Sequence, residues 1–89
     1  MAGGEHPFYN IMFYTYVLES TVDKKLYIGF TGNLKKRVSE HNQGQVMATK
    51  SRRPLILIYY EACLNEGKAI KREKYFKTGF GRRYLKERI

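Results

Sequence analysis

Phe13-Tyr14-Thr15-Tyr16-Val17-Leu18 and Lys25-Leu26-Tyr27-Ile28-Gly29-Phe30 are the stretches that decide the fold, because aromatic and β-branched residues fill both of them. That composition is typical of β-strands. The polar link of residues 19–24 is short enough for an antiparallel hairpin. The sequence therefore predicts that Tyr16 and Tyr27 lie on adjacent strands. Gly29 shares a face with Tyr27, and its missing side chain is expected to leave open space for a substrate beside the two phenols.

A helix and a third strand are expected after the hairpin. Asn33 is a candidate helix cap, and the helical spacing of apolar residues that follows it runs until Gly44. Residues 45–54 are polar and basic, which indicates a loop. Residues 55–60 are too short a run, and too rich in β-branched residues and tyrosine, for a helix. They predict the third strand.

Two helices complete the chain. Residues 65–79 read as one helix, with Asn65 as its cap and Gly79 suited to end it. Residues 82–88 add a short basic helix. The order strand, strand, helix, strand, helix, helix predicts an α/β (α+β) fold, in which helices flank a three-stranded, mostly antiparallel sheet. Residues 1–11 are expected to be a flexible lead-in, and residues 12–89 a single domain.

Glu73 stands in the 65–79 helix at a position where an apolar side chain is expected. Ala69, Ile70 and Phe76 recur around it at helical spacing, so the four side chains project from one face. A buried carboxylate is usually paired, protonated or bound to a cation. Two interpretations follow: Glu73 is a metal ligand, or it forms an internal ion pair with Arg37.

The composition narrows the choice of partner. The 89 residues suffice for one compact domain, and seventeen Lys and Arg against eight Asp and Glu give a net charge of +9 and a pI near 9.8. Such a balance attracts polyanions, nucleic acid first. A membrane surface is disfavoured, because the basic residues are spread through folded-looking segments. The single cysteine excludes an internal disulfide, and no apolar run could cross a bilayer. We expect a cytoplasmic monomer.

Arg37 and His41 lie one helical turn apart on the first helix, near the edge of the core. Together with the hairpin tyrosines and Glu73, they resemble the GIY-YIG endonuclease superfamily, specifically its small stand-alone members. Tyr27-Ile28-Gly29 matches the second half of the family motif. Tyr14-Thr15-Tyr16 keeps the terminal tyrosine of the first half. Arg37, His41 and Glu73 follow in the family's order.

The resemblance implies a metal-dependent endonuclease that hydrolyses phosphodiester bonds in DNA, with RNA as the alternative, in repair or recombination. Arg37 would clamp the phosphate, and Glu73 would bind Mg²⁺ or Mn²⁺. Tyr16 would be the general base, assisted by Tyr27 or His41.

The basic loop is the second expected contact with nucleic acid. Lys50, Arg52 and Arg53 are expected to be solvated and to touch backbone phosphate without specific geometry. Two other functions stay open at this point. One is a nucleic-acid-binding module with the same scaffold and little or no catalysis. The other is an interaction domain whose basic surface docks an acidic protein.

Overall fold

Strand β1 (Phe13–Ser20) is the centre of the sheet in the computed structural model, which describes residues 11–89. It pairs antiparallel with β2 (Leu26–Thr31) on one side and with β3 (Leu55–Cys63) on the other, so the strand order is β2-β1-β3. The predicted hairpin and third strand are confirmed. The expected division into a lead-in over 1–11 and a domain over 12–89 stays a prediction, because residues 1–10 lie outside the described part.

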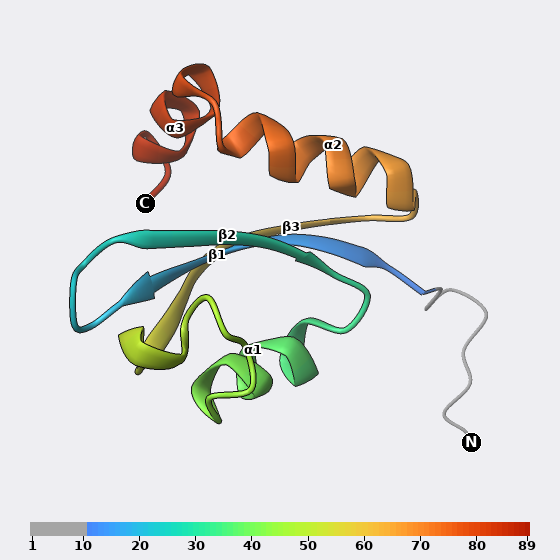
Figure 1. Cartoon of the computed structure of the whole chain (residues 1–89). Helices are drawn as coiled ribbons and strands as arrows, with labels where there is room; N and C mark the ends of the chain where they lie inside the picture. Colours follow the sequence, from blue (N-terminus) through green and yellow to red (C-terminus); the bar gives the residue numbers. More distant parts are fainter. Residues whose placement is uncertain (1–10) are drawn as a thin grey trace.

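Helices cover both faces of the sheet (Figure 1). The helix α1 (Leu34–Asn42) lies on one face, whereas α2 (Glu66–Phe76) and α3 (Gly79–Lys86) lie on the other. A short 3₁₀ turn, Lys50–Arg52, interrupts the loop between α1 and β3. The predicted α+β fold and its element order are confirmed. Between residues 11 and 89, no helix is long and apolar enough to cross a bilayer.

Asparagine side chains cap the N-termini of α1 and α2, as predicted. The Asn33 side chain accepts a hydrogen bond from the backbone N–H of Lys36, and Asn65 accepts one from Lys68. Each bond satisfies a backbone donor that has no partner within the helix. These local signals therefore place the starts of α1 and α2 correctly.

The predicted role of Gly79 as the end of the long helix is wrong. The helix α2 stops at Phe76, and Gly79 is instead the first residue of α3, which also begins earlier than the expected residue 82. Thr78 separates the two helices, because its hydroxyl accepts from the backbone N–H of Gly81 and caps α3. Gly81 is needed for packing: a Cβ there would collide with the backbone of Tyr75 at the end of α2.

The sheet is packed on both faces, which explains why four consecutive residues of β1, from 15 to 18, are buried instead of alternating between buried and exposed. On the α2 and α3 face the buried cluster consists of Val17, Ile28, Phe76 and Leu85. On the α1 face it consists of Tyr16, Leu18 and Leu55, with Tyr27, Leu34, Val38 and Leu57 packed against them. Two thin cores therefore sandwich β1, and Tyr16 belongs to the one beneath α1.

Candidate active site

Tyr16 lies directly opposite Gly29 in the β1–β2 ladder. Its ring and hydroxyl lie across Gly29, so that a Cβ at this position would collide with them. The expected open space beside the two phenols is therefore absent at Gly29, because the Tyr16 ring occupies it. What the glycine provides is the close approach that lets a bulky phenol lie flat over the edge strand.

His41 brings three rings together on the α1 side of the sheet. Its Nε2 atom lies 2.8 Å from the Tyr16 hydroxyl oxygen. The Tyr27 ring meets the imidazole edge-on, with 4.9 Å between centroids, and the Tyr16 and Tyr27 rings are 6.4 Å apart. Tyr16 is 1% exposed and His41 0%. Three of the predicted site residues thus form one aromatic group, in which Tyr16 and His41 are buried and Tyr27 is partly exposed.

Thr49 is a member of this group that sequence reasoning missed. Its hydroxyl oxygen lies 2.7 Å from His41 Nδ1, and both residues are fully buried. In the sequence Thr49 is one polar residue of a basic loop, and no periodicity connects it with the helix of His41. Only the way the loop folds back over α1 reveals the contact.

Arg37 stands at the partly exposed rim of this group. Its guanidinium forms an ion pair with Glu40 on the next turn of α1, at 3.0 Å. It also lies close enough to Tyr16 to act on the ionisation of that phenol. The guanidinium has donors to spare, since it carries five N–H groups and the ion pair uses one at this distance.

Glu73 lies on α2, which packs on the face of the sheet opposite to α1 (Figure 1). Ala69 and Phe76 point into the core, and Glu73 lies on the flank of that buried face with 22% of its side chain exposed. Its carboxylate pairs with Lys77 one turn later, at 3.1 Å. The suggested internal ion pair with Arg37 is therefore wrong, because Glu73 pairs with the cation that directly follows α2. Glu73 nonetheless acts on Tyr16 through its charge.

The electrostatics of the site keep both the phenol and the imidazole neutral. Burial raises the pKa of Tyr16 to about 12; Arg37 opposes this increase, and the neighbouring Tyr27 and Glu73 add to it. Burial also lowers the pKa of His41, and the positive charge of Arg37 lowers it further. A hydrogen bond between a neutral phenol and a neutral imidazole is what these shifts favour.

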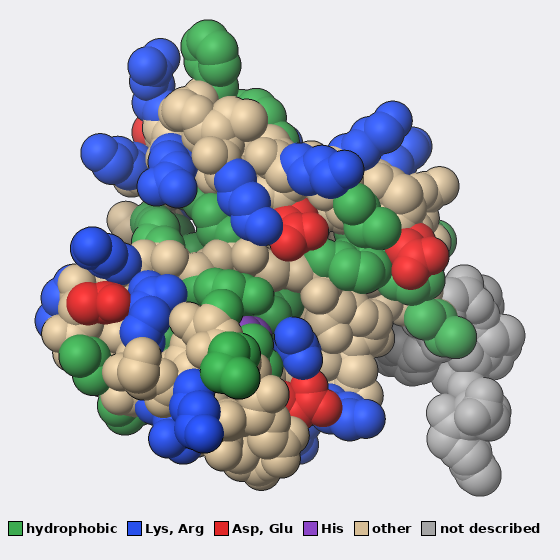
Figure 2. Space-filling model, viewed as in Figure 1, with side chains coloured by type: hydrophobic (Ala, Val, Ile, Leu, Met, Phe, Trp, Pro, Cys, Tyr) green, Lys and Arg blue, Asp and Glu red, His purple; other side chains and the backbone are tan. Residues whose placement is uncertain are grey.

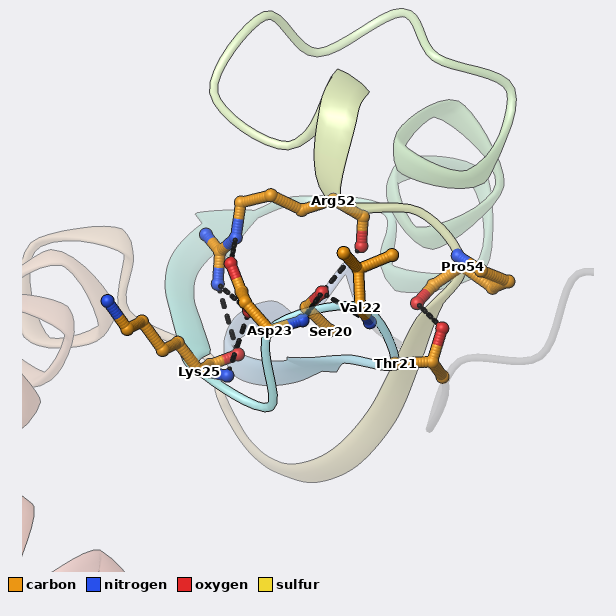
Figure 3. Close-up of polar contacts among 7 residues, drawn as sticks. All are labelled: Ser20, Thr21, Val22, Asp23, Lys25, Arg52 and Pro54. Carbon is orange, nitrogen blue, oxygen red and sulfur yellow. Dashed lines mark hydrogen bonds and ion pairs between the residues drawn. The ribbon is translucent and has the colours of Figure 1, made fainter.

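The basic loop has a different structure from the one predicted. The Arg52 guanidinium forms an ion pair with Asp23 in the hairpin turn, at 2.8 Å, and donates to the backbone oxygen of Lys25 (Figure 3). The hydrogen bond from the backbone N–H of Lys25 and the pairing with Arg52 keep the pKa of Asp23 well below its usual range. The expectation of a solvated Arg52 is therefore wrong. Lys50 and Arg53 are exposed, as expected, and their contact with phosphate stays a prediction.

The remaining motif residues have packing roles or lie beside the site. The Thr15 hydroxyl donates to the backbone oxygen of Ala69 and ties β1 to α2, at 2.8 Å. Ile28 belongs to the core. Tyr14 lines a groove of about 750 Å³, together with Leu34, Val38, Leu57 and Tyr60 among others. A smaller hollow of about 400 Å³, lined by Arg37 and Lys36 among others, adjoins the predicted site.

Glu73 is the one predicted metal ligand, and over residues 11–89 no cluster of three or more His, Cys, Asp or Glu side chains could hold an ion. Mg²⁺ does not need such a cluster, since it keeps several waters and binds through one or two carboxylates together with substrate phosphate. A single, partly exposed carboxylate whose charge acts on Tyr16 suits that mode of binding. The donor set therefore fits Mg²⁺ or Mn²⁺ held jointly with a substrate.

A family model described as the GIY-YIG catalytic domain matches residues 12–86. The chain therefore belongs to the GIY-YIG family. This membership implies a nuclease-type function acting on nucleic acid.

Within that family the chain is similar to UPF0213 proteins. It is 43% identical over 77 residues to the UPF0213 protein in the ldhD 5′ region of Pediococcus acidilactici, covering 83% of this chain and 78% of the relative. It is 46% identical over 66 residues to the UPF0213 protein of Syntrophus aciditrophicus, covering 72% and 75%. The solution NMR structure of the UPF0213 protein BH0048 from Bacillus halodurans superposes with a TM-score of 0.54, at 25% identity, covering 85% and 83%. These names state no activity or substrate.

Proposed function

We propose that this chain is a metal-dependent endonuclease that hydrolyses phosphodiester bonds in DNA, with RNA as the alternative substrate. The observation that carries the proposal is the setting of the Tyr16 hydroxyl. It hydrogen-bonds to His41, and the charges of Arg37 from α1 and Glu73 from α2 both act on it. An imidazole that is hydrogen-bonded to the phenol, and a guanidinium and a carboxylate whose charges act on it, thus come from both layers of the fold.

Arg37 is the proposed phosphate clamp. The transition state of phosphodiester hydrolysis gathers negative charge on the phosphate oxygens, and a guanidinium can meet two of them with parallel hydrogen bonds. Arg37 lines a hollow at the protein surface beside Lys36, so a phosphate could reach both cations. The Glu40 partner would hold the guanidinium in place without using its remaining donors.

Tyr16 and His41 are proposed to remove the proton from the attacking water together. As the water oxygen bonds to phosphorus, its proton passes to the Tyr16 oxygen, and the phenolic proton passes across the 2.8 Å hydrogen bond to Nε2 of His41. The leaving oxygen takes a proton from solvent. The His41 imidazolium later releases its extra proton to solvent, so the protein returns to its starting state. Tyr16 therefore never has to exist as a free phenolate, which its raised pKa disfavours. Tyr27 packs against His41 and orients the ring.

Glu73 is the proposed ligand of Mg²⁺ or Mn²⁺. When bound, the cation would stabilise negative charge on the phosphate. The ion would have to displace Lys77 from the carboxylate.

That Lys77 pair is the observation that favours the second candidate function, a nucleic-acid-binding module without turnover. If the lysine holds Glu73 in the presence of metal and substrate, the scaffold and its net charge of +9 remain suited to binding alone. Cleavage under metal titration separates the two functions.

The test is a cleavage screen over end-labelled single-stranded, duplex and branched DNA and single-stranded RNA, with Mg²⁺, Mn²⁺ or a chelator. Wild-type protein is expected to cut at least one substrate only with metal. Glu73→Gln and Arg37→Gln are each expected to reduce the rate by about 100-fold or more, because each removes a group that stabilises transition-state charge.

Glu66→Gln and Lys35→Gln are the matched controls, since each makes the same change in charge on the same helix as the tested residue, and Lys35 does not line the hollow beside Arg37. Both are expected to keep the rate within a few-fold of wild type. Equal rates for Glu73→Gln and Glu66→Gln would show that the metal site is misassigned. Binding without cleavage under every metal condition would establish the second function.

A further inference from the structure

A continuous chain of side-chain contacts runs from the active site into the loop between α1 and β3. Tyr16 contacts His41 through Nε2, at 2.8 Å, and His41 contacts Thr49 through Nδ1, at 2.7 Å. All three side chains are almost completely buried. Both imidazole nitrogens are therefore used, and no water can compete for either of them.

The loop that carries Thr49 is held at several points. Asn42 closes its two ends, because its side chain accepts from the backbone N–H of Leu55 at 2.7 Å and donates to the backbone oxygen of the same residue at 2.9 Å. Within the loop, the backbone oxygen of Thr49 accepts from the backbone N–H of Arg52 at 2.9 Å. The position of Arg52 thus decides the position of Thr49.

The hairpin turn in turn anchors Arg52 (Figure 3). The Ser20 hydroxyl donates to the backbone oxygen of Arg52 at 2.7 Å, and the Arg52 side chain pairs with Asp23. One residue beyond, the Thr21 hydroxyl donates to the backbone oxygen of Pro54. The loop is therefore fixed to the same hairpin that carries Tyr16, and Thr49 is presented to His41 as part of a rigid frame.

The direction of the hydrogen bonds follows from chemistry. A neutral imidazole carries one N–H donor and one acceptor nitrogen, and the partner of one nitrogen decides the role of the other. A phenol is more acidic than an alkyl hydroxyl and is the better donor, so Tyr16 donates to Nε2. Burial and the positive charge of Arg37 both lower the pKa of His41, so the ring is neutral and carries a single N–H. The imidazole proton then lies on Nδ1 and points to Thr49.

We propose that Thr49 is a positioning residue: its buried hydroxyl accepts the Nδ1–H of His41 and holds the imidazole in the tautomer whose Nε2 lone pair faces Tyr16. In this tautomer His41 can receive the phenolic proton, and the resulting imidazolium keeps its Nδ1–H bond to Thr49. In the other tautomer Nε2 already carries a proton and cannot accept one. The role of His41 as proton acceptor rests on the proposed nuclease function. The assignment of the tautomer rests only on the two hydrogen bonds of the imidazole.

The test measures the tautomer directly, by long-range ¹H–¹⁵N NMR of histidine-labelled protein without metal or nucleic acid. His41 in wild-type protein is expected to show the Nδ1–H form. Thr49→Val, which removes the hydroxyl at almost constant shape, is expected to lose that form, and Thr49→Ser to keep it. In the cleavage assay Thr49→Val is expected to lower kcat by about 10–100-fold with little change in KM, and Thr49→Ser to restore most of the rate.

Thr21→Val is the matched control, because it removes another threonine hydroxyl that holds the same loop but does not touch His41. It is expected to leave the tautomer and kcat unchanged. The Nε2–H form in wild-type protein, or a Thr49→Val protein with wild-type tautomer and kcat, would overturn the proposal. If Thr49→Val does not fold, the wild-type tautomer and the rate of Thr49→Ser decide. A wild-type protein with the Nδ1–H form but no cleavage contradicts only the nuclease function.

Discussion

Tyr16 shows how one side chain takes its properties from residues far away in the sequence. It lies across Gly29 on the neighbouring strand and contacts His41 from α1. Its charge state also depends on Glu73 from the opposite layer. Burial dominates these effects, so the phenol is neutral over the whole physiological range of pH. This is the chemical reason why a relay to His41, rather than a stable phenolate, is proposed.

The raised pKa of Tyr16 gives a prediction at the residue scale. In metal-free protein labelled with ¹³C at tyrosine Cζ, the Tyr16 resonance is expected not to move up to pH 10.0, the ordinary pKa of a phenol. In unfolded protein the same phenol loses its proton around that pH. The free energy of unfolding contributed by Tyr16 is therefore constant below pH 10 and decreases as the pH rises from 10 to about 12.

Tyr16→Phe assigns the resonance by its absence and serves as the control for the stability measurement. Its unfolding free energy is expected to decrease less than that of wild type over the same rise in pH. A Tyr16 resonance that titrates at or below pH 10 in folded protein would contradict the assignment of a buried, neutral phenol.

At the scale of elements, the contact between α2 and α3 depends on a missing side chain. Gly81 in the first turn of α3 sits against the backbone of Tyr75 and Phe76 at the end of α2. Gly79, in the same turn, has no neighbour within 4 Å of the position its Cβ would take. The two glycines are two residues apart, but only Gly81 has no room for a side chain.

Gly81→Ala is therefore expected to push the two helices apart and to lower the free energy of unfolding by about 1–3 kcal/mol. Gly79→Ala is expected to stay within about 1 kcal/mol of wild type, on the stabilising side, since alanine favours a helix. Chemical denaturation with fluorescence or circular dichroism measures both. Equal midpoints for the two variants would show that α3 does not pack on α2 through Gly81.

At the scale of the whole molecule, charge is the dominant property. Lys and Arg side chains are spread over the visible face, with few acidic side chains between them (Figure 2). Each ion pair joins one cation to one carboxylate and leaves the net charge of +9 unchanged. The unpaired cationic side chains that carry this net charge are free to act on a polyanion. Binding driven by this charge releases counterions from nucleic acid.

The affinity for duplex DNA is accordingly expected to fall linearly on a double logarithmic plot against salt concentration, with a slope of about −0.9 for each phosphate neutralised. Lys50→Gln and Arg53→Gln are each expected to make the slope shallower by about 1, because both side chains are exposed. Lys50→Arg keeps the charge and is expected to keep the slope. A flat salt response measured by fluorescence anisotropy would contradict charge-driven binding.

Much of this architecture could be predicted because its signals are short-range. A helix cap needs only one side chain and the backbone three residues later, as at Asn33 and Asn65. The hairpin follows from two runs of strand-forming residues and a short link. Even the unusual place of Glu73 on α2 is visible from helical spacing alone. The roles of the two glycines near α3 were not visible, since they depend on which helix lies above them.

From the amino acids alone came the α+β class, the element order, the basic character and the residue types of the candidate site, since periodicity, composition and capping act within a few residues. Tertiary structure alone decided that Tyr16 fills the space over Gly29 and that Thr49 contacts His41. These contacts join segments that meet only when the loops and layers pack, and many partners of similar chemistry compete for each position.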